Sequence, residues 1–166
     1  MSRIRELLRE RGGTLKALVL FGSYVYDLLR SRDIDLLVVV DRLDDAKEKT
    51  SLELEIVRIL KRYVKDKPLD VVVLDVESFR ENLKLGALAS GLIAGFEPIY
   101  DEIGVNSMIE ELLRETSRGG ERVVIVKRGR RLDLSSLAKA KLKVLESESR
   151  IIRNNNKHNI SNKTNI

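Results

Sequence analysis

Apolar positions recur along the chain with two different periods, which predict alternating strands and helices. Short, nearly continuous apolar runs bounded by charged residues or glycine are typical of buried strands. Apolar residues three or four positions apart are typical of helices. We expect strands at residues 15–21, 33–40, 69–75 and 97–100, and helices at residues 2–11, 24–30, 41–65, 78–94 and 104–117.

The chain changes character after Gly119-Gly120. The stretch RVVIVKRGRRLDL predicts a hairpin that turns near Arg128-Gly129, and a last helix is expected at residues 135–153. Residues 154–166 contain six asparagines and few apolar side chains, so we expect them to be disordered. The predicted organisation is one main domain (1–118), a hairpin-and-helix appendage (119–153) and a disordered tail (154–166).

Composition narrows the chemistry that the protein can perform. With 166 residues, 43% of them hydrophobic, the chain can bury one proper core. There is no cysteine and only one histidine, His158, in the polar tail. The absence of cysteine excludes disulfides, thiol catalysis and cysteine-bound metals. The single histidine in the polar tail disfavours serine–histidine hydrolysis. Any chemistry must use carboxylates, hydroxyls and bound metal.

No segment suggests a membrane or secretion signal. The longest uncharged apolar run, residues 85–96, is much shorter than the roughly 20 residues that a membrane-spanning helix needs. The first residues do not resemble a signal peptide. We therefore expect a soluble, cytoplasmic protein.

The net charge of +5 is unevenly distributed. Residues 1–118 hold 19 Lys/Arg against 22 Asp/Glu, whereas residues 119–166 hold 12 against 4. The basic last third is either a well-solvated surface or a binding surface for an anionic partner such as nucleic acid, and the sequence leaves both open.

Two aspartates begin the strand expected at residues 33–40, whose other members are all apolar. Because strand side chains alternate, Asp33 and Asp35 project to one side and Ile34 to the other. Two carboxylates held that close repel each other unless a cation lies between them. A hard divalent ion resolves the conflict, and Mg²⁺ favours one or two carboxylates together with phosphate oxygens and water.

Two further features complete a possible phosphate and metal site. Asp70 opens the next expected strand, where strand pairing could bring it to the same ion, and three carboxylates can hold two metal ions for phosphoryl transfer. Gly22-Ser23 ends the first strand, where glycine allows close backbone approach and a strand-to-helix turn offers N–H groups to phosphate.

The order of these features is more selective than any one of them. The stretches FGSYVYDLLRSRDIDLLVVV and PLDVVVLD resemble the nucleotidyltransferase family related to DNA polymerase beta, and within it the minimal nucleotidyltransferases. The family pattern is a Gly-Ser turn, a D-x-D pair about ten residues later and a third acidic residue on a following strand. The stretch GFEPIYDE resembles the short closing strand, so the resemblance spans residues 12–102.

The resemblance implies a fold and an activity. The fold is α/β (α+β), a small mixed sheet flanked by helices, here with a C-terminal hairpin and helix. The activity is transfer of a nucleotidyl group from ATP or another nucleoside triphosphate, with Mg²⁺ and release of pyrophosphate. Carried over by residue, Gly22 and Ser23 hold the triphosphate, and Asp33, Asp35 and Asp70 bind metal. Asp70 or Asp35 also assists deprotonation of the acceptor hydroxyl.

One departure concerns the segment after Gly-Ser. Many minimal members continue with x-x-Arg-Gly, where this chain has Tyr26 and Asp27. An arginine that helps neutralise triphosphate is therefore missing from its usual place, and Arg30 or Arg32 could compensate. The departure bears on catalytic rate more than on fold.

Three functions remain open from the sequence. The first is an active nucleotidyltransferase that acts as the antitoxin-like partner of a HEPN-domain ribonuclease, as similar small proteins do by transferring AMP to a tyrosine. The second is a non-catalytic module that binds nucleotide or a partner. The third is a transferase acting on nucleic acid or a small molecule, with residues 119–166 holding the acceptor. The preferred base, the acceptor and any self-association are not determined by the sequence.

Overall fold

The computed structural model describes residues 1–84, 86–119, 123–127 and 130–161. It divides the chain into two compact units, Met1–Leu112 and Leu113–Ile166. The boundary between the two units lies inside one helix, α6 (Val105–Arg118). The predicted division at 118/119 falls six residues later, at the end of that helix. The functional organisation into domain, appendage and tail stays a prediction.

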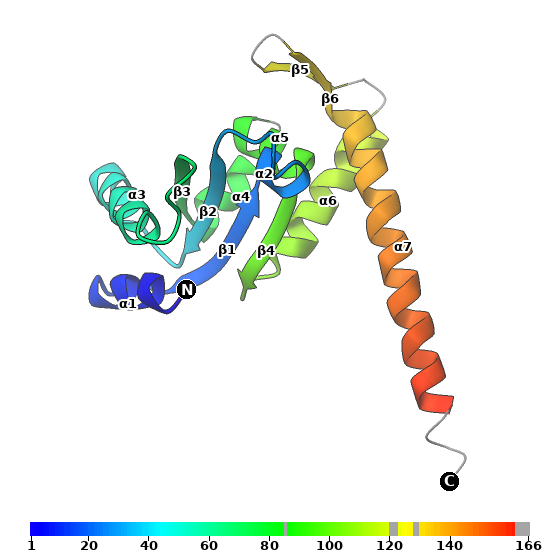
Figure 1. Cartoon of the computed structure of the whole chain (residues 1–166), viewed down its shortest axis with the longest axis horizontal. Coiled ribbons are helices and arrows are strands. Elements are labelled where there is room, and N and C mark those ends of the chain that lie inside the picture. The colour runs from blue at the N-terminus through cyan, green and yellow to red at the C-terminus, as the bar shows by residue number, and fades with distance from the viewer. Residues whose placement is uncertain (85, 120–122, 128–129, 162–166) are drawn as a thin grey trace. The chain divides into compact units, whose positions relative to one another are not determined.

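The first unit is built on a four-stranded mixed sheet in the order β3-β2-β1-β4 (Figure 1). β1 pairs with β2 and with β4 in antiparallel fashion, and β2 pairs with β3 in parallel. The predicted mixed sheet flanked by helices is thereby confirmed. The strands are β1 (Leu15–Phe21), β2 (Ile34–Val40), β3 (Leu69–Asp75) and β4 (Phe96–Asp101).

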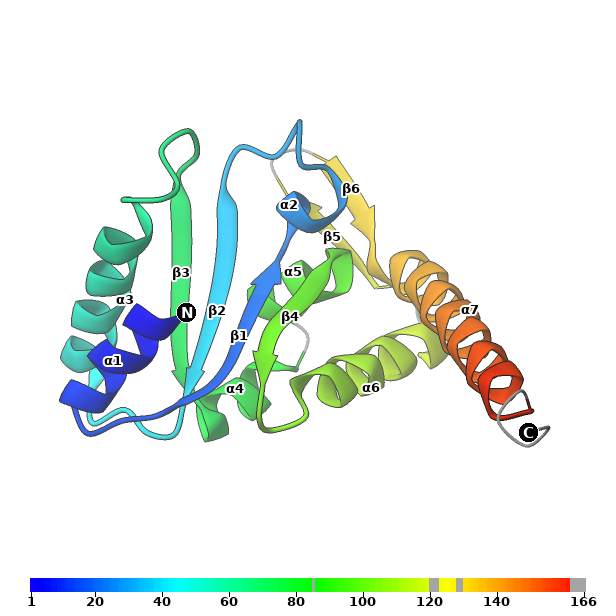
Figure 2. The same ribbon diagram turned by 60° about the horizontal axis from the view of Figure 1, so that its bottom comes forward.

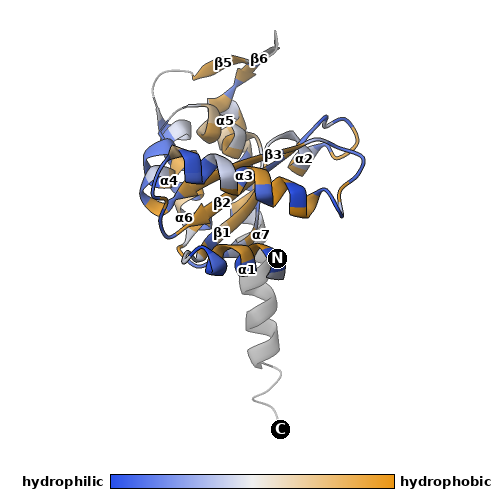
Figure 3. Cartoon of the chain, turned by 90° about the vertical axis from the view of Figure 1, so that its left-hand side faces the viewer, coloured by the Kyte–Doolittle hydropathy of each residue, from blue (hydrophilic) through white to orange (hydrophobic). Residues whose placement is uncertain are grey.

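One face of the sheet is covered by two amphipathic helices, α1 (Ser2–Glu10) and α3 (Ala46–Leu60). Figure 3 shows that the strands are largely apolar, whereas α1 and α3 carry both hydrophilic and hydrophobic residues. Burial of the apolar stripe of each helix stabilises this layer because about 25 cal/mol is gained per Å² of apolar surface removed from water. The first core cluster comprises Ile4, Leu8, Leu15, Leu18, Leu36, Val38, Val40, Leu52, Ile56, Val71 and Val73.

The opposite face is covered by α4 (Val76–Asn82), α5 (Ala87–Ala94) and the beginning of α6; Figure 2 shows α5 behind β1 and α6 beside β4. Successive residues of a strand alternate between the two faces, so β2 contributes Leu36 and Val38 to the first cluster and Leu37 and Val39 to the second. The second core cluster comprises Ala17, Val19, Phe21, Leu37, Val39, Leu74, Phe79, Leu92, Val105 and Ile109.

Several helix ends differ from the sequence-based expectation. The helix expected at 41–65 begins only at Ala46, because the Asp45 carboxylate caps it by accepting hydrogen bonds from the N–H groups of Lys47 and Glu48. The helix expected at 78–94 is two helices, separated before Gly86, whose backbone is extended. Apolar periodicity continues through the break and therefore did not reveal it.

The two short helices α1 and α2 show smaller differences from the expected bounds. α1 begins at Ser2, with Met1 at its N-cap position and no side-chain cap. The helix expected at 24–30 is shorter: α2 spans Ser23–Tyr26 and ends at Asp27.

The second unit contains the end of α6, a hairpin and a long helix. The hairpin of β5 (Val124–Lys127) and β6 (Arg130–Asp133) confirms the predicted one, although its predicted turn at 128–129 lies outside the described residues. α7 (Leu134–Ser161) follows at once, with Asp133 accepting a 3.0 Å hydrogen bond from the Ser136 N–H.

The last helix is longer than expected. Residues 154–161, predicted to be disordered, continue α7, while residues 162–166 lie outside the described part. Extending a helix that has already formed adds one hydrogen bond per residue fixed, whereas only its nucleation is unfavourable, so asparagine-rich composition does not by itself end it.

No helix among the described residues is both long and apolar enough to span a membrane.

Candidate functional site

The turn between β1 and α2 accepts only glycine. Gly22 has φ 77° and ψ −154°, a backbone conformation that L side chains rarely adopt. A Cβ placed on Gly22 would overlap the carboxylate of Asp35 and lie 3.0 Å from its Cγ atom. The Gly22 N–H donates a 2.9 Å hydrogen bond to the carbonyl of Gly95, which joins this turn to the start of β4. Asp35 is therefore packed directly against the Gly-Ser turn.

Asp35 and Asp70 lie on one face of the sheet. They are register partners in the parallel β2–β3 pair, and neighbouring strands lie about 4.8 Å apart. Asp35 shares its side of β2 with Leu37, and Asp70 shares its side of β3 with Leu74, both in the second core cluster. Asp35 is half-buried and Asp70 is exposed. The structure thus brings together two of the three predicted carboxylates and the predicted Gly-Ser turn.

The third carboxylate is placed differently. β2 begins at Ile34, so Asp33 is the last residue of the preceding loop rather than a strand residue. It is half-buried, and it is two positions before Asp35. Ser23 is half-buried at the start of α2, and Arg32 is exposed in the loop before Asp33. All six predicted site residues therefore belong to the same end of the sheet, where β1 ends and β2 and β3 begin (Figure 2).

The donor set fits a hard cation that is completed by other ligands. Within the described residues, no three His, Cys, Asp or Glu side chains are gathered closely enough to hold a metal by themselves. Mg²⁺ typically takes one or two carboxylates and fills its remaining positions with water and substrate phosphates. Two aspartates on neighbouring strands, beside a glycine turn, match that requirement. Their role as metal ligands stays a prediction.

The place of the family's Arg-Gly is taken by residues that build a turn. Tyr26 is the last residue of α2 and is 61% exposed. The Asp27 carboxylate accepts a 3.0 Å hydrogen bond from the Arg30 N–H, and its carbonyl accepts one from the Ser31 N–H. Asp27 therefore shapes the loop that leads to Asp33 and adds no positive charge to the site.

Two residues that sequence reasoning missed contribute to this end of the sheet. Gly95 supplies the carbonyl that holds Gly22, and a Cβ on Gly95 would come within 3.0 Å of the Gly22 carbonyl oxygen. Lys67 donates hydrogen bonds into the loop before Asp33. Neither could be found from sequence, because a single glycine after a helix and a single lysine before proline are common and carry no specific signal.

Other aspartates that follow strands have structural roles. The Asp75 carboxylate accepts a 2.7 Å hydrogen bond from the Ser78 N–H and caps α4. Burial would raise the pKa of Asp101, but hydrogen bonds from the N–H groups of Asn106, Val105 and Ile103 outweigh it and lower the pKa. These carboxylates lie at the end of the sheet opposite the site.

Comparison with known sequences gives the family. The profile of the nucleotidyltransferase domain family matches residues 1–92, which include all the predicted site residues. The chain belongs to the nucleotidyltransferase domain family. A search of curated proteins gives no significant match.

Comparison with solved structures gives weak likenesses of similar length. A mutant of the toxin–antitoxin pair MntA–HpeT is 18% identical, with 93% of this chain and 94% of that one covered and a TM-score of 0.40. The MNT antitoxin complex with a tri-AMPylated HEPN toxin of Shewanella oneidensis is 18% identical, covers 93% and 92%, and has a TM-score of 0.38. A toxin–antitoxin with AMP-PNP is 17% identical, covers 93% and 95%, and has a TM-score of 0.40. Likeness at this level does not extend their partners or ligands to this chain.

Proposed function

We propose that the protein is a Mg²⁺-dependent nucleotidyltransferase that transfers a nucleotidyl group, AMP from ATP in the first instance, to an acceptor hydroxyl. The observation that carries the proposal is the packing of Asp35 against Gly22 together with the pairing of Asp35 with Asp70 on one face. This arrangement places carboxylates that suit a cation beside the start of α2, where the Ser23 N–H can donate to phosphate. Membership of the family supports it.

The chain's own residues have distinct tasks in this proposal. Asp33, Asp35 and Asp70 are the metal ligands, and bound Mg²⁺ would neutralise the charge of the triphosphate. In the Gly22-Ser23 turn, the Ser23 N–H and hydroxyl hold phosphate oxygens, because the Gly22 N–H already donates to the Gly95 carbonyl. Arg32 approaches from the loop.

The reaction is a substitution at the α-phosphorus. The acceptor oxygen forms a bond to this phosphorus, the bond to the bridging oxygen of pyrophosphate breaks, and Asp70 or Asp35 accepts the hydroxyl proton on a carboxylate oxygen. Asp70 is exposed and Asp35 is half-buried, so an acceptor that approaches from solvent reaches Asp70 more readily.

The acceptor that we propose is a tyrosine hydroxyl of a HEPN-domain ribonuclease. This follows from the resemblance of the Gly-Ser and D-x-D stretches to minimal nucleotidyltransferases, which serve as antitoxins of such proteins. In this arrangement the transferred AMP would inactivate the ribonuclease. The basic residues 119–166 would contact the partner or an RNA that it binds.

A binding module without turnover is the second candidate. Tyr26 and Asp27 in place of Arg-Gly favour it, because Asp27 is committed to the turn and the segment supplies no cation to the triphosphate. Such a protein would still bind Mg²⁺ and ATP.

A labelling experiment distinguishes these functions. Purified protein, Mg²⁺ and α-labelled ATP are incubated separately with the product of the neighbouring gene and with total RNA. Label on the product of the neighbouring gene supports the proposed acceptor, and label on RNA indicates a nucleic-acid transferase. Label on neither, with stabilisation by Mg²⁺ and ATP, indicates the binding module. The Asp33→Asn, Asp35→Asn double variant is the control, and equal stabilisation of that variant would contradict the metal assignment.

A further inference from the structure

Lys67 contacts two of the segments that surround the candidate site. Its Nζ atom donates hydrogen bonds to the carbonyl of Leu28 at 2.8 Å, the carbonyl of Ser31 at 2.5 Å and the hydroxyl of Ser31 at 3.0 Å. The same atom lies 5.4 Å from the centre of the Tyr24 ring. These contacts reach α2 directly after Ser23 and the loop directly before Asp33.

The geometry makes Lys67 a structural tie and not a phosphate ligand. A lysine ammonium has three hydrogens, and three protein oxygens accept them here. Two of these oxygens belong to Ser31, which is buried, with 7% of its surface exposed. A charged donor strengthens each of these bonds relative to a neutral one.

Lys67 also lies two residues before the start of β3. Its neighbour Pro68 offers a carbonyl that accepts a 2.9 Å hydrogen bond from the Ile34 N–H, and Asp70 follows two residues later. The lysine side chain and this backbone bond therefore link the start of β3 to the residues on either side of Asp33. Because Asp33 lies in a loop and not in the ladder, these links limit how far it can move from Asp70.

The loop has little apolar packing of its own. Leu29 is 92% exposed and Leu28 is 55% exposed, so burial of these side chains does little to hold residues 27–33 in place. Hydrogen bonds hold the loop instead: those within it to Asp27, and those from Lys67, which connect it to the start of β3.

We propose that Lys67 is a positioning residue of the nucleotide site, which fixes the loop carrying Arg32 and Asp33 against the strand carrying Asp70. The inference rests on the proposed function, since it assigns these three residues to nucleotide and metal. Loss of the tie widens the range of positions of Asp33, and the metal–nucleotide complex then loses affinity even though no ligand has been removed.

The test measures affinity for Mg²⁺ with AMP-PNP in the absence of any acceptor, because this analogue is blocked only at its β–γ bridge and keeps the α–β bond that the proposed transfer breaks. Lys67→Met keeps most of the apolar stem and removes all three donors, and we expect it to weaken binding about tenfold, as losses of supporting contacts around metal sites do. Lys67→Arg retains charge and donors and should recover most of that loss.

Lys61→Met is the matched control. Lys61 is exposed and, like Lys67, lies in the segment between α3 and β3. Its 3.1 Å hydrogen bond to the carbonyl of Lys67 stays within that segment and does not reach the loop before Asp33. We expect affinity close to wild type. Ser31→Ala, which removes one of the three acceptors, should give a smaller loss in the same direction and covers the case in which Lys67→Met does not fold.

Amide hydrogen exchange separates failure of this inference from failure of the proposed function. If the tie exists, amides of residues 28–33 exchange faster in Lys67→Met while those of α3 do not, whether or not wild type binds nucleotide. Unchanged exchange in this loop would overturn the inference. So would a lower melting temperature with unchanged AMP-PNP affinity, since that describes a purely structural lysine. Absence of binding by the wild-type protein would instead contradict the proposed function.

Discussion

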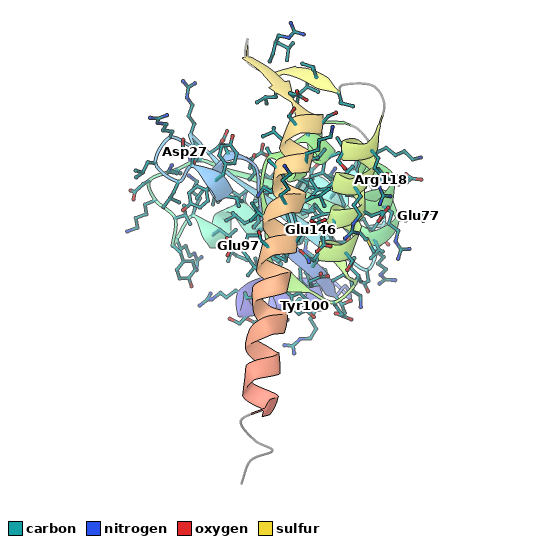
Figure 4. The ribbon with its side chains drawn as sticks, turned by 90° about the vertical axis from the view of Figure 1, so that its right-hand side faces the viewer. Asp27, Glu77, Glu97, Tyr100, Arg118 and Glu146 are labelled. Atoms are coloured by element: carbon teal, nitrogen blue, oxygen red, sulfur yellow. The ribbon has the colours of Figure 1, made fainter. Side chains whose placement is uncertain are left out.

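The two ends of the four-stranded sheet use aspartates in different ways. Where β2, β3 and β4 end, Asp41, Asp75 and Asp101 accept hydrogen bonds from nearby backbone N–H groups. Where β2 and β3 begin, Asp35 and Asp70 share a face beside Gly22. Figure 4 labels one residue near each end of the sheet: Asp27, in the loop that leads to Asp33, and Tyr100, close to the C-terminal end of β4.

The difference follows from the local backbone. A helix that begins directly after a strand has N–H groups without partners, and Asp75 and Asp101 satisfy such groups, whereas Asp41 accepts from the Thr14 N–H directly before β1. Asp101 caps the start of α6 with bonds of 2.8 Å to the Val105 N–H and 3.0 Å to the Asn106 N–H. At the beginning of a strand the backbone groups are paired in the ladder, and the carboxylates of neighbouring strands share one face instead. The first arrangement stabilises the fold, and the second suits the binding of a cation.

The largest expected effect is the loss of activity in Asp35→Asn. The substitution retains shape but removes the charge that would hold the metal, so nucleotidyl transfer should fall by about a thousandfold or more. The melting temperature should stay unchanged or rise, because repulsion between the site carboxylates is relieved. Label transfer and thermal unfolding are measured on the same preparation. Transfer at the wild-type rate would end the enzymatic interpretation.

The next effect concerns the glycine that packs against Asp35. Gly22→Ala should lower the free energy of unfolding by about 2–4 kcal/mol, from a strained φ and from overlap with the Asp35 carboxylate. Gly104→Ala is the matched control: Gly104 has φ 75° and no atom within 4 Å of the position that a Cβ would take, so only the backbone contribution of about 1 kcal/mol applies. Urea unfolding measures both. Equal losses would show that Asp35 does not pack against Gly22.

The opposite end should respond in stability and not in chemistry. Asp101→Ala removes the cap of α6 and should lower the free energy of unfolding by about 1–2 kcal/mol. Transfer by the folded fraction should stay at the wild-type rate, because Asp101 is at the far end of β4 from Phe96, which pairs with Phe21 beside Gly22. A selective loss of transfer without destabilisation would reverse the roles that we give to the two ends.

The smallest effect is a difference in acid sensitivity. Burial would raise the pKa of Asp41, but hydrogen bonds from Thr14 outweigh it and lower the pKa, as backbone N–H groups do for Asp101. A lowered folded-state pKa means that the stabilisation is complete above the ordinary value of 3.8 and is lost as the pH falls through the folded value. Asp101→Asn should therefore lose less stability than wild type below about pH 3.8. Parallel acid-unfolding curves would contradict the assigned pKa direction.

The positions of the main elements could be read from the sequence because their periodicity is local. Continuous apolar runs predicted β1 and β3 with the observed ends. The mixed sheet was predicted from the resemblance to the family. The helix ends were less predictable. Asp45 displaced the start of α3, and the break before Gly86 interrupted an apolar pattern that continues on both sides of it.

The sequence alone determined the candidate residues, since the Gly22-Ser23 turn and the aspartates at 33, 35 and 70 stand out from their apolar surroundings. Only the tertiary structure decided how they are arranged: Asp35 and Asp70 share a face, Asp33 lies in a loop, and Asp35 packs against Gly22. It also introduced Lys67, whose partners are 36 and 39 positions away in the chain. Alternation along a strand is a property of neighbouring residues and is visible in the sequence, whereas register between strands and contacts of a single lysine depend on the packing of segments that are distant in the chain.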